Sequence, residues 1–215
     1  MSNINVAIIN YESGNVHSAS KALELALKES KLNGRISITQ DPEAILKADR
    51  IVLPGVGAFS SCYKKLNSIP GLKDSIIEKV FKKGAPILGI CVGLQIMADK
   101  GYENEEVKGL GWIPGEVVNL KPKNKNLKIP HMGWNEIKFG KGEDYFSILN
   151  KRDFYFVHSY YFKAKNNDNI LAETNYDNPF PSILIKENIL GTQFHPEKSQ
   201  KNGIEFLKKF LLWKP

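Results

Sequence analysis

Cysteine and arginine are scarce in this sequence, and none of its apolar runs is long. The cysteines are Cys62 and Cys91, too few for the disulfide framework of a small secreted domain. No stretch approaches the ~18 consecutive apolar residues that a membrane-spanning helix needs. The first residues also lack a basic head followed by an apolar run. These absences predict a cytoplasmic protein that makes no contact with a membrane.

Arginine occurs only at Arg35, Arg50 and Arg152, although the formal net charge is +7. Base-specific recognition of nucleic acid relies on bidentate arginine contacts, and no nucleic-acid-binding motif is found in the sequence. The densest basic stretch, residues 121–128, interleaves lysine with asparagine, which is typical of a solvated loop. We therefore predict no nucleic-acid partner, and a basic surface able to attract a phosphorylated substrate or an acidic partner.

The residues that are present have the composition of a globular protein, with 42% hydrophobic and 25% charged among 215. This length fits one large α/β domain, which we predict over residues 3–215. In the first half, short β-branched runs alternate with helical patterns, which predicts a parallel sheet covered by helices on both faces. Strands are predicted at residues 4–9, 35–39, 51–53 and 86–90, and helices begin at Asn15 and at Asp41.

After about Gly101 the pattern changes, and short strands follow one another. They are predicted at residues 116–120, 136–139, 154–158, 170–174, 182–186 and 189–193, with a turn at 186–189 and a closing helix at 201–213. Such spacing is typical of antiparallel hairpins. The predicted fold class is therefore α/β, a mostly parallel central sheet flanked by helices, with antiparallel strands added in the second half. Sheets of this kind bind ligands beyond the carboxyl ends of their strands.

Cys91 lies in the sequence Gly-Ile-Cys-Val-Gly at 89–93, between a predicted strand and a helix predicted at 94–98. This is the nucleophile-elbow pattern, with cysteine in the serine position. The strand must turn sharply into the helix, so side chains two positions either side of the nucleophile would collide. The turn exposes the sulfur at the helix N-terminus, where unpaired amides favour a thiolate. Cys62 has neither an elbow nor a base beside it in the sequence, and we predict that it is a buried structural residue.

A thiolate that attacks a carbonyl group needs hydrogen-bond donors for the oxyanion that forms. The amide of Val92, directly after the nucleophile, is one candidate donor. The second donor is expected from the loop at 54–59, whose glycines allow positive φ. Taken alone, this loop also fits a plain strand-to-helix turn. It lacks the lysine and hydroxyl of a phosphate-binding P-loop.

Of the four histidines, His195 is the one followed closely by an acid, Glu197. The proline between them favours an extended backbone at His195, so the carboxylate can orient one ring nitrogen and leave the other for the thiol. We expect His158 to be a satisfied core histidine and His17 to be solvated. His131 lies in the unusual segment 129–134, without an obvious acid partner. The chemistry alone predicts a cysteine-based acyl transferase or hydrolase and does not identify the acyl group.

Six segments together resemble the class-I (triad) glutamine amidotransferases, and among these most of all the glutaminase subunits of imidazole glycerol phosphate synthases. The resemblance runs over nearly the whole chain. The segments are residues 11–15, 54–59, 89–95, 129–135, 156–160 and 191–200. The cysteine elbow and the His-Pro-Glu run are common to the whole class, whereas residues 54–59, 130–135 and 197–200 resemble this subunit in particular.

The resemblance implies a glutaminase with a Cys-His-Glu triad, without cofactor or metal. Cys91 would attack the side-chain amide of glutamine to form a glutamyl thioester. His195 would protonate the departing ammonia and then activate water, while Glu197 holds His195. The residues implied to contact glutamine or its intermediate are Gly57, Val92, Gln95, Ser159 and Tyr160.

The resemblance also implies a heterodimer with a (β/α)₈-barrel cyclase, which receives the ammonia through its interior. The products would be imidazole glycerol phosphate and an aminoimidazole carboxamide ribotide, made in histidine biosynthesis. The residues implied to face the partner are Asn15, Trp134, Tyr155 and Lys198. Glu12 departs from the family pattern, because glycine usually occupies that position, on a loop expected near the partner.

Three other interpretations remain open from the sequence. The same glutaminase chemistry can serve a different synthase, such as an enzyme that amidates a surface sugar, and only the partner distinguishes that case. A stand-alone cysteine hydrolase would need basal hydrolytic activity without a partner, and segment 130–135 would have no functional role in it. A non-catalytic binding module is disfavoured by the intact Cys91, His195 and Glu197.

Overall fold

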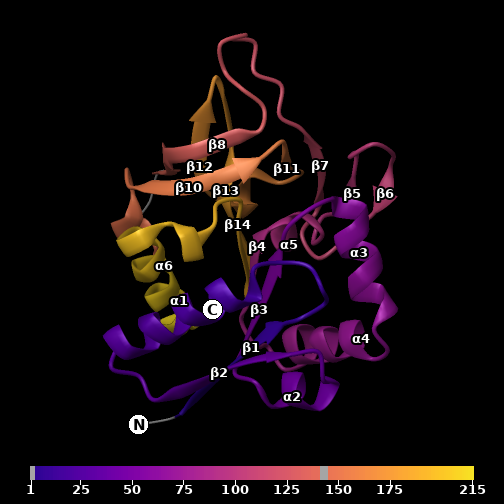
Figure 1. Ribbon diagram of the computed structural model, residues 1–215, viewed down its shortest axis with the longest axis vertical. Helices are drawn as coiled ribbons and strands as arrows, with labels where there is room; N and C mark the ends of the chain where they lie inside the picture. The colour runs from indigo at the N-terminus through magenta and orange to yellow at the C-terminus, as the bar shows by residue number, and fades with distance from the viewer. Residues whose placement is uncertain (1–2, 141–144) are drawn as a thin grey trace.

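The computed structural model describes residues 3–140 and 145–215, and an eight-stranded sheet forms its centre (Figure 1). The strand order is β2-β1-β3-β4-β14-β13-β12-β9. The first five strands in this order run parallel and the last three pair antiparallel, which confirms the predicted fold class. Their bounds are β1 (Ile4–Ile9), β2 (Gly34–Thr39), β3 (Arg50–Gly55), β4 (Ile87–Cys91), β9 (Lys138–Phe139), β12 (Ile170–Tyr176), β13 (Asn178–Lys186) and β14 (Ile189–Thr192).

Helices cover both faces of the parallel part of this sheet (Figure 1). On one side α1 (Val16–Glu29) packs against α6 (Gln200–Leu212). On the other side lie α2 (Pro42–Lys47), α3 (Phe59–Ser68) and α4 (Leu72–Ile77), the last continued by a π-helical turn at Glu78–Lys82. In the described part of the chain, no helix combines the length and apolar character needed to cross a bilayer.

The predicted helix starts are confirmed, and each has a local cause. The Asn15 side chain accepts a hydrogen bond from the Ser18 amide at the start of α1, and Asp41 does the same for the Glu43 amide in α2. Proline at the first position of α2 lacks an amide that would in any case be unpaired there. Six side chains along one stripe of α1 are buried, which fixes that helix against the sheet: Ala19, Ser20, Ala22, Leu23, Ala26 and Leu27.

Two smaller sheets stand beyond one end of the central sheet (Figure 1). One pairs β8 (His131–Glu136) with β10 (Asp153–His158) in antiparallel register. The other has the order β11-β7-β5-β6, with β5 (Lys100–Gly101), β6 (Val107–Lys108), β7 (Gly115–Asn119) and β11 (Tyr160–Ala164). The space between these sheets and the carboxyl ends of β3 and β4 holds the cavity described below.

Two sequence predictions of local structure were wrong. The helix predicted at 94–98 is α5 (Val92–Gln95), which ends early because the carbonyls of residues 96–99 accept hydrogen bonds from amides of residues 109–113 instead. The strand predicted at 136–139 is two strands, because β8 pairs with β10 as far as Glu136 and β9 pairs with β12. Strand β8 therefore includes most of the unusual segment 129–134.

Candidate active site

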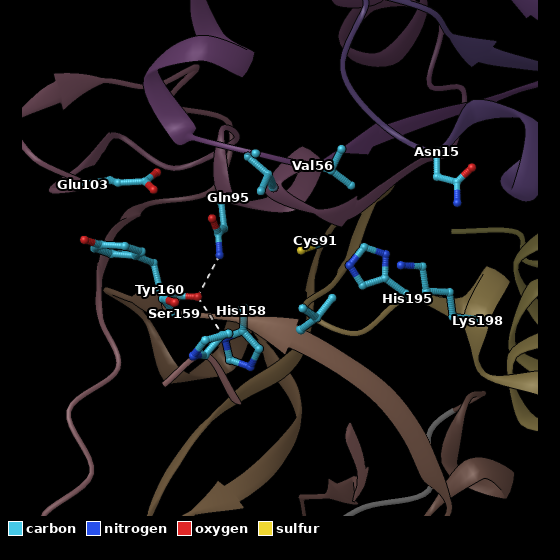
Figure 2. Close-up of a pocket in the computed structure, with 14 residues that line it drawn as sticks. Asn15, Val56, Cys91, Gln95, Glu103, His158, Ser159, Tyr160, His195 and Lys198 are labelled. Carbon is cyan, nitrogen blue, oxygen red and sulfur yellow. Dashed lines mark hydrogen bonds between the residues drawn. The ribbon is translucent and has the colours of Figure 1, made fainter. Parts of the chain in front are cut away.

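A cavity of about 510 Å³ opens where β4 meets α5, and it gathers most of the residues predicted from the sequence (Figure 2). The predicted residues that line it are Cys91, His195, Gly57, Val92, Gln95, Ser159, Tyr160, Asn15 and Lys198. The other three, Glu197, Trp134 and Tyr155, lie beside it and contact residues of this set or one another. Residues far apart in the sequence therefore converge at the carboxyl end of the parallel strands.

Cys91 occupies a strained turn between β4 and α5, with φ at 53°. A backbone in this left-handed region costs on the order of 1–3 kcal/mol for a residue other than glycine and is typical of functional sites. A Cβ on Gly93 would lie 1.9 Å from the Leu53 carbonyl oxygen, and one on Gly89 would lie 2.8 Å from the Leu94 Cα. The collisions predicted for the elbow glycines are thus confirmed, and the turn directs the sulfur into the cavity.

His195 and Glu197 form a buried pair beside this sulfur. The Nδ1 atom of His195 lies 2.8 Å from Oε1 of Glu197, and their side chains are 2% and 3% exposed. Nδ1 is taken by Glu197, so Nε2 is the ring nitrogen left for the thiol, and Figure 2 shows the imidazole beside the sulfur of Cys91. Burial lowers the pKa of His195, but Cys91 and the Glu197 carboxylate outweigh it and hold the pKa above its ordinary value. The ring is therefore suited to carry a proton.

Backbone contacts hold the loop that carries His195 against β10. The His195 amide donates to the Tyr155 carbonyl at 2.9 Å, and the Ser199 hydroxyl donates to the His195 carbonyl at 2.7 Å. The rings of Phe154 and Phe194, which precede Tyr155 and His195, pack against each other at a tilt with centroids 4.2 Å apart. These contacts fix the imidazole in place before any substrate arrives.

Gln193 also reaches the nucleophile, and the sequence analysis missed it. Its Nε2 atom donates to the Cys91 sulfur at 3.7 Å, and its Oε1 accepts a hydrogen bond from Gln95 Nε2 at 3.1 Å. Gln95 Nε2 also donates to the Tyr160 carbonyl at 2.8 Å (Figure 2). A signal was available, because side chains two positions apart in an extended segment point to the same side, and Gln193 precedes His195 by two.

His131 and His158 form a second buried pair that is neutral. His158 Nδ1 donates to the Tyr160 carbonyl, so its Nε2 accepts from His131 Nδ1 at 3.0 Å, and His131 Nε2 accepts from Asn135 at 3.2 Å. Burial lowers the pKa of His131 to about 4 and that of His158 to about 3. The expectation of a satisfied core histidine at His158 is confirmed, His131 is its partner, and His17 is exposed as expected.

Glu103 brings a carboxylate to the cavity wall, which the sequence analysis did not anticipate. It comes from the loop between β5 and β6, and Figure 2 shows it near Gln95 and Tyr160, away from His195. One of its oxygens accepts a hydrogen bond from the Phe59 amide at 2.7 Å, at the start of α3. No motif or periodicity of this loop pointed to the residue.

Both backbone segments predicted to supply oxyanion donors reach the cavity. The Val92 amide follows the nucleophile at the start of α5, and Val56 and Gly57 line the cavity opposite. Gly57 adopts φ of 93°, while no described atom lies within 4 Å of the position that a Cβ would take. The glycine is therefore required here for its backbone conformation, not for space.

Three residues predicted to face a partner form one continuous surface beside the cavity mouth. The rings of Trp134 and Tyr155 meet edge to face with centroids 6.0 Å apart, and Lys198 Nζ lies 5.8 Å from the Tyr155 ring centroid. Trp134 is 48% exposed and its neighbour Met132 is 62% exposed. Large exposed apolar side chains that cluster in this way are typical of interaction surfaces. Within the described residues, no three His, Cys, Asp or Glu side chains gather as metal ligands would.

Glu12, the departure from the family pattern, lies on the loop between β1 and α1, where its carbonyl accepts a hydrogen bond from Lys65 Nζ at 2.6 Å. Its φ is 58°, in the left-handed region that glycine adopts without cost. Glycine at this position is therefore favoured by the backbone, and glutamate is tolerated there with some strain.

Comparison with known proteins agrees with the geometry. A family model described as glutamine amidotransferase class-I matches residues 7–213. The chain is 45% identical over 214 residues to imidazole glycerol phosphate synthase subunit HisH of Agrobacterium fabrum, covering 98% of this chain and 99% of that one. It is 45% identical over 210 residues to the subunit of the same name from Ruegeria pomeroyi, covering 97% and 99%.

Solved structures show the same fold at low sequence identity. A crystal structure of a glutamine amidotransferase superposes with a TM-score of 0.69 at 16% identity, covering 96% of this chain and 99% of that chain. A glutamine amidotransferase from Thermotoga maritima gives a TM-score of 0.61 at 18% identity, covering 99% and 85%.

Proposed function

The chain belongs to the class-I glutamine amidotransferase family, and from this premise we propose that it is the glutaminase subunit of an imidazole glycerol phosphate synthase. It hydrolyses glutamine to glutamate and ammonia and passes the ammonia to its partner. The observation that carries the proposal is the convergence of Cys91, His195 and Glu197 at one cavity, in a chain 45% identical to relatives of that name over almost their full length. Neither a different synthase nor a stand-alone hydrolase is favoured by those relatives.

In the proposed mechanism the Cys91 thiolate attacks the carbonyl carbon of the glutamine side-chain amide. The tetrahedral intermediate collapses when the C–N bond breaks and His195 gives its proton to the departing nitrogen, which leaves ammonia and a glutamyl thioester. Water then attacks the thioester while His195 takes its proton, and the C–S bond breaks to release glutamate. Glu197 fixes the His195 tautomer and stabilises the imidazolium, which fits the raised pKa of the ring.

The amides of Val92 and Gly57 are the proposed donors to the oxyanion of both tetrahedral intermediates. Gln95, Ser159 and Tyr160 are proposed to contact the glutamine backbone and side chain, because they line the cavity wall on the other side of Cys91 from His195 (Figure 2). The hydrogen bonds from Gln95 to Gln193 and to the Tyr160 carbonyl hold that wall in place.

Glu103 is proposed to bind the α-ammonium group of glutamine, since it supplies a carboxylate to the cavity wall far from His195. We expect Glu103→Gln to raise the KM for glutamine about tenfold with a smaller effect on kcat, because a charge-assisted hydrogen bond contributes about 1.5–3 kcal/mol and partial exposure reduces this. The carbonyl oxygen of the substituted side chain can still accept the hydrogen bond from the Phe59 backbone amide, so the substitution removes only the negative charge. Steady-state glutaminase kinetics provide the measurement.

The matched control is Glu105→Gln, which removes the same charge from an exposed position on the same loop. Its KM should equal that of the unaltered enzyme. An unchanged KM in Glu103→Gln would contradict the assignment of Glu103 to the α-ammonium group.

The names of the relatives imply a partner subunit, and we propose that the partner is a (β/α)₈-barrel cyclase in a heterodimer. The proposed contact surface is the one formed by Trp134, Tyr155 and Lys198 beside the cavity mouth, with Asn15 at its edge. Its apolar rings and its position next to Cys91 support this assignment, because ammonia must leave the cavity toward the acceptor without reaching bulk water.

Reconstitution with the cyclase subunit of the same organism tests the proposed function. Mixing the two subunits with glutamine and the phosphorylated ribonucleotide intermediate should form imidazole glycerol phosphate and the aminoimidazole carboxamide ribotide in equal amounts. The products can be separated and quantified by liquid chromatography. Product formation from added ammonia but not from glutamine would overturn the proposal.

A further inference from the structure

Three buried polar side chains behind the oxyanion loop have no part in the chemistry described above. Tyr11 and Ser13 belong to the loop between β1 and α1, and Cys62 belongs to α3. None of the three is among the described residues that line the active-site cavity. Cys62 was predicted to be a small structural hydrophobe, but its sulfur lies 2.9 Å from the Ser13 hydroxyl oxygen.

These side chains hold two carbonyl groups of the oxyanion loop. The Tyr11 hydroxyl donates to the Pro54 carbonyl at 2.6 Å, and the Ser13 hydroxyl donates to the Val56 carbonyl at 2.8 Å. The Cys62 thiol is a second donor to the Val56 carbonyl, at 3.4 Å, and its sulfur contacts the Ser13 hydroxyl oxygen. Burial raises the pKa of both Tyr11 and Cys62, so both keep their protons.

The direction of the Val56 carbonyl determines the direction of the next amide. A peptide unit is planar and trans, so its N–H points opposite to its C=O. The Val56 carbonyl points toward Ser13 and Cys62, and the Gly57 amide therefore points away from them. Gly57 lines the cavity, and its amide belongs to the same peptide unit as this carbonyl, so the orientation of that amide depends on the carbonyl staying where it is.

We propose that Tyr11, Ser13 and Cys62 form a clamp that holds the Pro54 and Val56 carbonyls and so positions the oxyanion loop, including the Gly57 amide, at the cavity, with Ser13 as its central positioning residue. This inference rests on the proposed glutaminase function and adds a set of residues that act through the backbone of loop 54–57. Gly14 strengthens the attachment, because a Cβ there would lie 3.1 Å from the Pro54 carbonyl carbon, so the two loops are in direct contact.

Ser13→Ala in the assembled two-subunit enzyme tests the clamp. We expect kcat for glutamine hydrolysis to fall about 10–100-fold, because complete loss of an oxyanion donor costs about 100–1000-fold and a freed peptide still samples the correct orientation. The KM for glutamine should change by less than about twofold, since the oxyanion forms only after binding. Cys62→Ala should give a smaller fall, because Ser13 still donates to the Val56 carbonyl in that variant.

Ser75→Ala is the matched control. The Ser75 hydroxyl is also buried and also donates to a backbone carbonyl, that of Leu72, at 2.8 Å, but it lies on α4 away from the cavity. Both serine variants should lower the thermal unfolding midpoint by similar amounts, and only Ser13→Ala should lower kcat. A kcat in Ser13→Ala equal to that of Ser75→Ala, or higher than that of the unaltered enzyme, overturns the clamp.

The same measurements separate this proposal from the proposed function. If the unaltered enzyme and Ser75→Ala both fail to hydrolyse glutamine in the complex, the glutaminase function itself is wrong. If both are active and Ser13→Ala matches them, the glutaminase function stands and the clamp is wrong.

Discussion

Replacing Cys91 with alanine is expected to abolish glutamine-dependent synthesis by the assembled enzyme and to leave synthesis from added ammonia intact. Removing the nucleophile of a catalytic triad costs at least ~10⁴-fold in turnover, because the remaining groups have no covalent intermediate to act on. The cysteine produces ammonia and does not touch its acceptor, so the reaction in the partner subunit should proceed once ammonia is supplied. Product formation from each nitrogen source, measured side by side, provides the test.

Cys62→Ala is the matched cysteine substitution. It leaves the nucleophile in place and removes the two contacts of Cys62 to Ser13 and to the Val56 carbonyl, while Ser13 still holds that carbonyl, so measurable glutamine-dependent turnover should remain. Loss of the ammonia-dependent reaction in Cys91→Ala would contradict the division of labour between the subunits. Circular dichroism and the unfolding midpoint of each variant exclude global unfolding as the cause of any loss.

The nucleophile and its base could be predicted from the sequence because their spacing has a steric cause. The elbow permits only glycine at 89 and 93, where a side chain would strike Leu94 and the Leu53 carbonyl. His195 and Glu197 could be predicted for a different reason. They are two positions apart in the chain, and an extended backbone is enough to bring their side chains together. Where the catalytic residues depend only on neighbours close in the chain, their spacing in the sequence is enough to predict them.

Contacts that arise from the pairing of distant strands could not be predicted in this way. His131 and His158 meet because they are directly opposite each other in the β8–β10 pair, and β8 was not recognised as beginning at His131. Glu103 reaches the cavity from a loop between two very short strands, which carries no periodic pattern. The residues behind the oxyanion loop are likewise brought together from the loop after β1 and from α3, more than 40 positions apart in the chain.

The predicted helix at 94–98 shows how tertiary contacts override a local pattern. Its residues are apolar and suited to a helix, yet α5 ends at Gln95. The carbonyls that would continue the helix are taken by amides of the loop at 109–113, including that of Leu110 to Ile96 and that of Trp112 to Met97. Hydrogen-bond partners far along the chain therefore determine where this helix stops.

The isolated chain is expected to hydrolyse glutamine very slowly, and the partner together with its nucleotide ligand should accelerate the reaction about 100–1000-fold, the effect of one oxyanion donor. Ammonia released without an acceptor is lost, together with the glutamine that supplied it. We therefore expect the oxyanion hole to be incomplete in the isolated chain. The candidate switch is the loop from Gly55 to Gly57. The hydroxyls of Tyr11 and Ser13 hold the carbonyls of Pro54 and Val56, so the peptide between Gly55 and Val56 is the one they do not hold.

Val56 lines the cavity, so rotation of that peptide can turn the Val56 amide toward Cys91 as a further oxyanion donor beside those of Val92 and Gly57. Gly55, which lacks a side chain, offers little resistance to this rotation. A side chain at Gly55 would strike the Gly93 amide at 2.4 Å, so glycine is also required there for close packing on the elbow. A ligand bound to the partner can favour one orientation only through contacts that differ between the two states. The surface of Trp134, Tyr155 and Lys198, next to the cavity mouth, is where such contacts can be made.

Gating is tested by steady-state glutaminase rates for the chain alone, with the partner, and with the partner plus nucleotide. The chain with nucleotide alone is the control. Equal turnover in all of these conditions would rule out gating and restore the stand-alone hydrolase as the better account.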